Sequence, residues 1–92
     1  MILIADSGST KCSWAMCNQE GIKLKEYNTI GFNPYFIKKE TILEELKNSE
    51  LEKYKNEITH VFFYGAGCST KQKNKIIEIP LGKYFCRAEI NV

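Results

Sequence analysis

The residues with the clearest chemical potential are a carboxylate and several hydroxyls in a short turn near the N-terminus. Asp6 ends an apolar run, and small or polar residues follow it: Ser7, Gly8, Ser9, Thr10 and Lys11. Gly8 allows a ligand to approach the backbone closely, and successive amides together with the side-chain hydroxyls offer donors to phosphate oxygens. Asp6 supplies the oxygen ligands that Mg²⁺ prefers, directly or through water. The segment therefore predicts a phosphate-binding turn with a magnesium site at Asp6.

The same residue types also form ordinary hairpin turns, because Asp, Ser and Gly favour turns for conformational reasons alone. Spacing by itself does not separate the two interpretations. The segment is not a Walker A loop, because the pattern G-x-x-x-x-G-K-[ST] is absent. It is not a dinucleotide-binding turn either, since a strand rather than a helix is expected after it. Lys11, the first residue of that strand, either adds positive charge near the phosphates or points to solvent.

The apolar pattern predicts an α/β domain that positions this turn. The expected elements are strands 2–5, 12–17 and 22–27, helix 36–55, strand 59–64, helix 70–85 and strand 86–92. The first three strands form an antiparallel meander that ends in an edge strand. Asn48-Ser49 divides the first helix, and Pro80 is expected to kink or split the second. The order β-β-β-α-β-α-β gives a mixed five-stranded sheet flanked by helices, in a single domain over 1–92.

Strands 2–5 and 59–64 show no alternation of apolar and polar residues, so both are expected to be buried on two faces. A right-handed crossover makes them parallel neighbours, which brings Gly65-Ala66-Gly67 beside Asp6. Open α/β sheets bind ligands at the carboxyl ends of their strands, so this turn could meet a ligand. The alternative is a plain strand-to-helix turn capped by Ser69 or Thr70. Asn33-Pro34 is a turn or a helix start with Asn33 as the N-cap.

Composition narrows the functional classes. The chain has 92 residues, 43% of them apolar and 26% charged, with a formal net charge of +2, which does not favour nucleic acid as a partner. No apolar run has the roughly 20 residues of a membrane span, and no signal peptide is evident, so a cytoplasmic location is expected. The four cysteines form no C-x-x-C pair, and His60 is an unsuitable fourth zinc ligand. Free, buried thiols are the expectation.

Three motifs in order resemble one ATPase superfamily. They are Asp6-Ser-Gly-Ser-Thr-Lys11, Gly31-Phe-Asn-Pro-Tyr35 and Phe63-Tyr-Gly-Ala-Gly-Cys-Ser69. The first is similar to the phosphate motif of the actin, hexokinase and heat-shock-chaperone ATPases. The set most resembles the BadF/BadG/BcrA/BcrD-type ATPases and the N-acetylglucosamine kinases grouped with them. The resemblance implies a ribonuclease-H-like domain, the first half of a two-domain actin-like ATPase fold.

The resemblance also implies function. The complete protein would be an ATP-dependent kinase for N-acetylglucosamine or a related amino sugar, with ATP and Mg²⁺ as cofactors. Asp6 would order the metal and 7–11 would hold the phosphates. Asn33 and the turn Gly65, Ala66 and Gly67 would face the sugar.

The catalytic base is expected just beyond Val92 and the adenine site in an absent C-terminal domain, so this chain alone should be inactive and prone to self-association. A homodimer is compatible with the family. The alternatives are a partner-driving ATPase and a ribonuclease-H-like nuclease.

Overall fold

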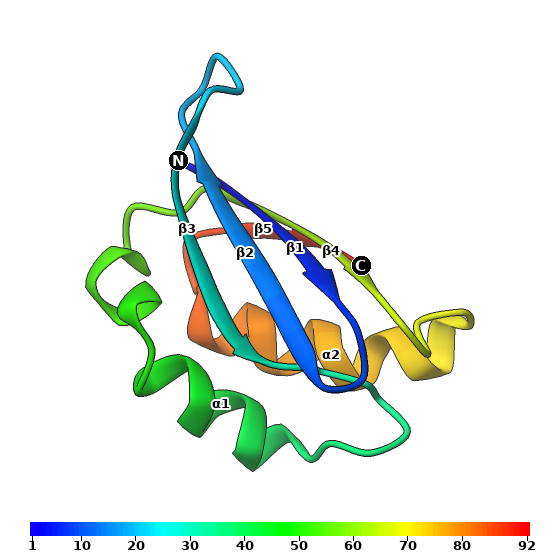
Figure 1. Cartoon of the computed structure of the whole chain (residues 1–92). Coiled ribbons are helices and arrows are strands. Elements are labelled where there is room, and N and C mark those ends of the chain that lie inside the picture. The colour runs from blue at the N-terminus through cyan, green and yellow to red at the C-terminus, as the bar shows by residue number, and fades with distance from the viewer.

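The computed structural model describes residues 1–92 as one mixed sheet with helices packed against it. In chain order the elements are β1 (Ile2–Ser7), β2 (Lys11–Cys17), β3 (Lys23–Ile30), α1 (Lys39–Lys47), the 3-10 helix η1 (Glu50–Tyr54), β4 (His60–Gly65), α2 (Lys71–Tyr84) and β5 (Glu89–Asn91). The five strands lie in the order β3-β2-β1-β4-β5 (Figure 1). The predicted order of strands and helices, and the α/β fold class, are confirmed.

Strand register brings the chemically interesting residues to one edge of the sheet. β1 pairs with β2 and β2 with β3 in antiparallel fashion, which is the expected meander. β4 is parallel to β1, with Asp6 opposite Tyr64 and Ser7 opposite Gly65. The turn after β1 and the turn after β4 are therefore neighbours, as the crossover rule predicts.

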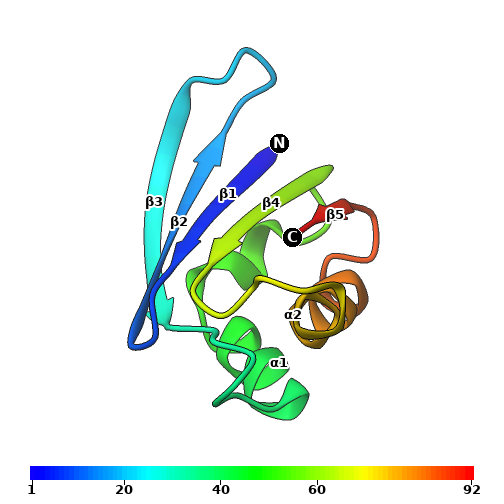
Figure 2. The same ribbon diagram turned by 90° about the vertical axis from the view of Figure 1, so that its right-hand side faces the viewer.

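The core lies on one face of the sheet only. Both helices pack against that face (Figure 2), where Leu3, Ala5, Trp14 and Phe63 are buried. The opposite face of β1 carries Ile4, which is 39% exposed. The prediction that β1 and β4 are buried on both faces is therefore wrong for this chain. Two right-handed crossovers that run in the same direction across a sheet place their helices on the same side.

The helices differ from the expected boundaries in two ways. α1 begins at Lys39 rather than near residue 36, after Lys38, whose side chain makes no capping hydrogen bond. α2 runs without interruption through Pro80, so the prediction that Pro80 splits it is wrong. Proline removes one helical hydrogen bond, yet Pro80 and Leu81 are both buried on the apolar face of α2. The division between α1 and η1 near residues 48–49 is confirmed.

All four cysteines are free thiols, but they are not all buried. Cys12 and Cys17 are buried as expected, Cys68 is partly buried, and Cys86 is exposed, so the expectation of burial is wrong for Cys86. β5 is only three residues long, and Cys86 precedes it in the loop after α2. None of the helices has the length and apolar character needed to cross a bilayer.

Candidate phosphate and sugar site

The candidate site is built around the hairpin between β1 and β2. The Gly8 amide donates to the Lys11 carbonyl at 2.8 Å, which closes a tight turn with Ser9 and Thr10 at its tip. Both tip residues are exposed, as is Lys11 at the start of β2. Asp6 is also exposed and lies one residue before the end of β1. A carboxylate, two hydroxyls and a lysine are thus open to a ligand within six consecutive residues.

Ser7 holds the segments of the site together, and its hydroxyl is already used in hydrogen bonds within the fold. Its hydroxyl oxygen accepts from the Phe32 amide at 2.8 Å, and its hydroxyl donates to the Gly8 carbonyl at 3.1 Å. Its own carbonyl accepts from the Ala66 amide at 2.9 Å. Ser7 is only 3% exposed. The Ser7 side chain therefore ties the hairpin to the loop after β3, while its backbone ties the hairpin to the turn after β4.

Gly31 was not among the predicted site residues, yet it decides how closely the loop meets the hairpin. A Cβ atom at this position would lie 2.2 Å from the Gly8 carbonyl oxygen and 2.6 Å from the Ser9 carbonyl carbon. Only glycine can occupy such an approach between two backbones. The signal in the sequence was a glycine directly before Phe32-Asn33, at the end of β3.

Asn33 sits between the hairpin and the turn after β4. Its Nδ2 donates to Ser9 Oγ at 3.1 Å, and its Oδ1 accepts from the Tyr35 amide at 3.0 Å. The Asn33 carbonyl accepts from the amides of Phe36 and Ile37, so the residue opens a single turn. The interpretation of Asn33 as the N-cap of the following helix is wrong, because α1 begins only at Lys39.

The turn after β4 supports the loop that carries Asn33. Gly67 has φ +82°, a backbone conformation that favours glycine, and a Cβ there would lie 2.6 Å from Asn33 Oδ1. Thr70 caps α2, since its hydroxyl oxygen accepts from the Lys73 amide at 3.1 Å. Lys73 Nζ lies 4.2 Å from the centroid of the Tyr35 ring, and this contact links α2 to the loop. The capping interpretation is confirmed with Thr70 as the N-cap, and contact of the turn with a ligand stays a prediction.

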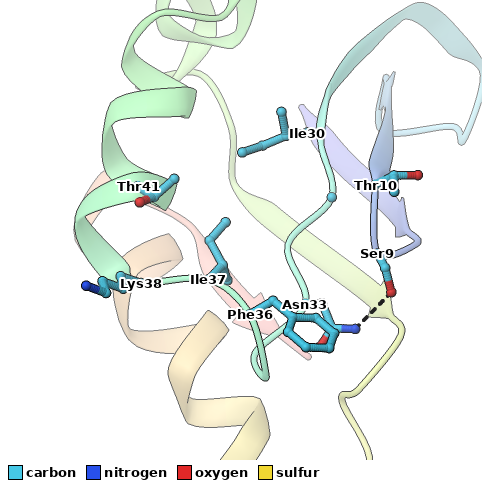
Figure 3. A pocket seen from close by; sticks show the side chains of 9 residues that line it. Ser9, Thr10, Ile30, Asn33, Phe36, Ile37, Lys38 and Thr41 are labelled. Atoms are coloured by element: carbon cyan, nitrogen blue, oxygen red, sulfur yellow. Dashed lines mark hydrogen bonds between the residues drawn. The ribbon is translucent and has the colours of Figure 1, made fainter.

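A pocket of about 390 Å³ opens between the hairpin tip and the start of α1 (Figure 3). Its walls are mixed: Ser9, Thr10, Asn33, Lys38 and Thr41 offer polar groups, and Ile30, Phe36 and Ile37 offer apolar ones. Phe36 is 81% exposed. Gly65, Ala66 and Gly67 are not among the residues that line this pocket.

Comparison with solved structures extends these observations. One match is the protein named "Putative N-acetylglucosamine Kinase" from Porphyromonas gingivalis, with a TM-score of 0.83 and 33% identity over 99% of this chain. This match confirms the resemblance to the N-terminal domain of BadF-type, N-acetylglucosamine kinase-like proteins. It spans 34% of the length of the Porphyromonas protein. No protein-family model and no curated protein matches the chain.

In this kinase-like domain, Asp6 is the residue that could hold a metal. No group of three or more His, Cys, Asp and Glu side chains is arranged to bind one. The single carboxylate of Asp6 fits Mg²⁺, which commonly takes one or two protein carboxylates and completes its shell with water and substrate phosphates. Beneath the hairpin, burial raises the pKa of the Cys12 thiol to about 12, and Asp6 adds to the effect. Cys12 is therefore a neutral packing residue at neutral pH.

Proposed function

We propose that the chain is the N-terminal part of an ATP-dependent sugar kinase that phosphorylates N-acetylglucosamine or a related amino sugar. The observation that carries the proposal is the hydrogen-bonded junction of the hairpin with the loop after β3. Ser7 accepts from Phe32, and Asn33 donates to Ser9. A phosphate-binding element and a candidate sugar-binding element are thereby held in contact, which phosphoryl transfer requires.

The phosphates are assigned to the tip of the hairpin. Gly8 leaves the backbone accessible, because a Cβ there would still have its nearest neighbour at 3.6 Å. The hydroxyls of Ser9 and Thr10 are exposed and can donate to phosphate oxygens, whereas that of Ser7 is already used within the fold. Lys11 is exposed beside them and adds positive charge. Such transfer depends mainly on positioning and charge neutralisation.

Asp6 is assigned to magnesium. Its exposed carboxylate, one residue before the end of β1, can hold the ion directly or through water while the phosphates supply further oxygens. A bound Mg²⁺ would neutralise phosphate charge.

The sugar is assigned to the loop at 31–35 and the pocket beside it. The family resemblance gives Asn33 to a sugar hydroxyl and the turn 65–67 to the floor of the cleft, although this turn is not among the residues that line the pocket. The pocket combines hydroxyl and amide groups with Ile30, Phe36 and Ile37, which suits a ring that carries both hydroxyls and an apolar substituent. The catalytic base is assigned to a position just beyond Val92, and the adenine contacts to a second domain outside this chain.

Nucleotide binding by the complete protein tests the phosphate assignment. Calorimetric titration with Mg·ATP should give saturable binding that weakens when Thr10 is replaced by Ala and that loses its magnesium dependence in Asp6→Asn. Lys53→Ala, in η1, is the matched control, because its exposed side chain lies on a different element from the hairpin. Binding that is unchanged in both hairpin variants would show that the nucleotide site lies elsewhere.

A further inference from the structure

The side chain of Glu45, in α1, supports an inference that rests on the proposed function and deepens it. Glu45 belongs to none of the three sequence motifs and is not among the residues that line the pocket. We propose that Glu45 is a positioning residue. It holds the Ile30 wall of the pocket at the distance from α1 at which the pocket selects an N-acylated amino sugar over an unsubstituted hexose.

The contact that supports this role is a hydrogen bond between the end of β3 and α1. The Ile30 amide donates to Glu45 Oε2 at 3.1 Å, across 15 positions of the chain. β3 is an edge strand, so the amides that point away from β2 have no strand to bond, and Glu45 serves this one. It is the one hydrogen bond between α1 and the sheet. The buried side chains of Ile42 and Leu46 otherwise join α1 to the core by apolar packing, which has no preferred direction.

The bond joins two opposite walls of the pocket. Ile30 faces the pocket from the end of β3, and Thr41 faces it from the start of α1 (Figure 3). Glu45 follows Thr41 by four residues within the same helix, which places both side chains on the same face of α1. The Glu45 side chain therefore bridges the α1 wall and the backbone of the Ile30 wall, and its length limits how far the two can separate.

The other side of the Ile30 wall is already fixed. Gly31 meets the hairpin so closely that a Cβ there would lie 2.2 Å from the Gly8 carbonyl oxygen. The Phe32 amide donates to Ser7 Oγ at 2.8 Å. The end of β3 is thereby held against the hairpin, so the width of the pocket depends on the position of α1. The bond from Ile30 to Glu45 fixes that position.

The apolar side chains of the pocket connect this width to the choice of sugar. Ile30 is 43% exposed and lines the pocket together with Phe36 and Ile37. The methyl group of an acetamido substituent gains dispersion energy from such walls only at van der Waals distance, and a gap of about 1 Å forfeits up to about half of each contact. Glucose carries a hydroxyl in place of that substituent and gains little from the same walls. A wider pocket should therefore penalise the amino sugar more than glucose.

Steady-state kinetics of the complete protein test the inference. The readouts are kcat/KM for N-acetylglucosamine and for glucose, or the inhibition constant of glucose where its turnover is too slow to follow. E45A removes the acceptor, whereas E45Q keeps one, because glutamine retains a side-chain carbonyl oxygen. E44A is the matched control, since Glu44 is the exposed neighbour of Glu45 in α1. I30A removes the apolar wall itself, and E45A/I30A completes a double-mutant cycle.

We expect E45A to lower kcat/KM for N-acetylglucosamine about fivefold, the worth of one hydrogen bond, and to change the value for glucose by less than about twofold. E45Q should restore the selectivity, and E44A should leave it unchanged. E45A/I30A should be no less selective than I30A, because both changes remove the same contact. The Ile30 amide should exchange with solvent faster in E45A than in E45Q, as measured by NMR. Circular dichroism checks that each variant is folded.

An E45A variant that keeps the selectivity of the wild type would overturn the inference. Equal losses for both sugars would also overturn it, because a purely structural role of Glu45 predicts them, as would selectivity losses that multiply between E45A and I30A. The proposed function fails in a different way. A wild-type protein without sugar-dependent release of ADP would refute the kinase assignment and this inference together, whereas a kinase that does not distinguish the two sugars would refute this inference alone.

Discussion

Replacing Gly31 with alanine should damage the site and the fold together. The new Cβ would lie 2.2 Å from the Gly8 carbonyl oxygen and 2.8 Å from that of Ser9. Both neighbours are backbone atoms, so no side-chain rotation relieves the contact. The loop and the hairpin must separate by about 1 Å to reach ordinary van der Waals distances. That movement is enough to break the 2.8 Å bond from the Phe32 amide to Ser7.

The free-energy cost combines two effects. Overpacking costs about 1–3 kcal/mol, and each hydrogen bond lost between loop and hairpin costs about 1 kcal/mol. We therefore expect Gly31→Ala to lower the free energy of unfolding by about 2–4 kcal/mol, which corresponds to a fall in Tm of at least about 10 °C for a domain of this size.

Urea and thermal unfolding, followed by circular dichroism and by the fluorescence of the single tryptophan, measure this cost. Trp14 suits the purpose because its ring centroid lies 5.8 Å from that of Phe32, next to the loop. Gly8→Ala is the matched control on the hairpin, where a Cβ has its nearest neighbour at 3.6 Å, and Gly82→Ala is the control in α2, at 3.9 Å. Both should stay within about 1 kcal/mol of the wild type. A Gly31→Ala variant as stable as these controls would refute the reasoning.

Three further predictions follow from other contacts. Asp6→Asn in the complete protein should abolish turnover and leave the melting temperature nearly unchanged, because Asp6 is exposed; turnover that persists would remove its metal role. In thiol labelling at pH 8, the exposed Cys86 should react first, and Cys12, whose pKa burial raises to about 12, should react only on unfolding; early labelling of Cys12 would show that the hairpin does not cover it. Tyr84→Phe should cost about 1 kcal/mol, because it removes the one hydroxyl hydrogen that Tyr84 shares between the Leu46 carbonyl and Glu52. Burial and Glu52 raise the pKa of Tyr84, so its contribution is complete below pH 10 and declines as the pH rises further. The stability gap between wild type and Tyr84→Phe in urea unfolding should therefore narrow above pH 10, and a constant gap would contradict this assignment.

The sequence alone was sufficient to predict the strand order and the meeting of two turns. Apolar runs marked β1 and β4, and the handedness of crossovers made them parallel neighbours. The same apolar runs led to the wrong prediction that β1 and β4 are buried on both faces. An apolar residue such as Ile4 has the same sequence signature whether its face is covered or, as in this structure, 39% exposed.

The roles of individual site residues were harder to predict, because they depend on contacts between distant segments. Ser7 was expected to bind phosphate, yet it accepts a hydrogen bond from a residue 25 positions away. Asn33 donates to a residue 24 positions earlier. No local pattern encodes such pairs. Gly31 was visible as the first residue of a motif, but only the backbone of the hairpin explains why a side chain does not fit there.

Sugar-dependent release of ADP by the complete protein tests the central claim most directly. The assay compares N-acetylglucosamine, glucose and no sugar in the presence of Mg·ATP, with Asp6→Asn as the inactive control. We predict ADP release that requires the amino sugar and that is lost in the control. Release at the same rate with and without sugar would contradict the kinase assignment and favour an ATPase that drives a partner protein.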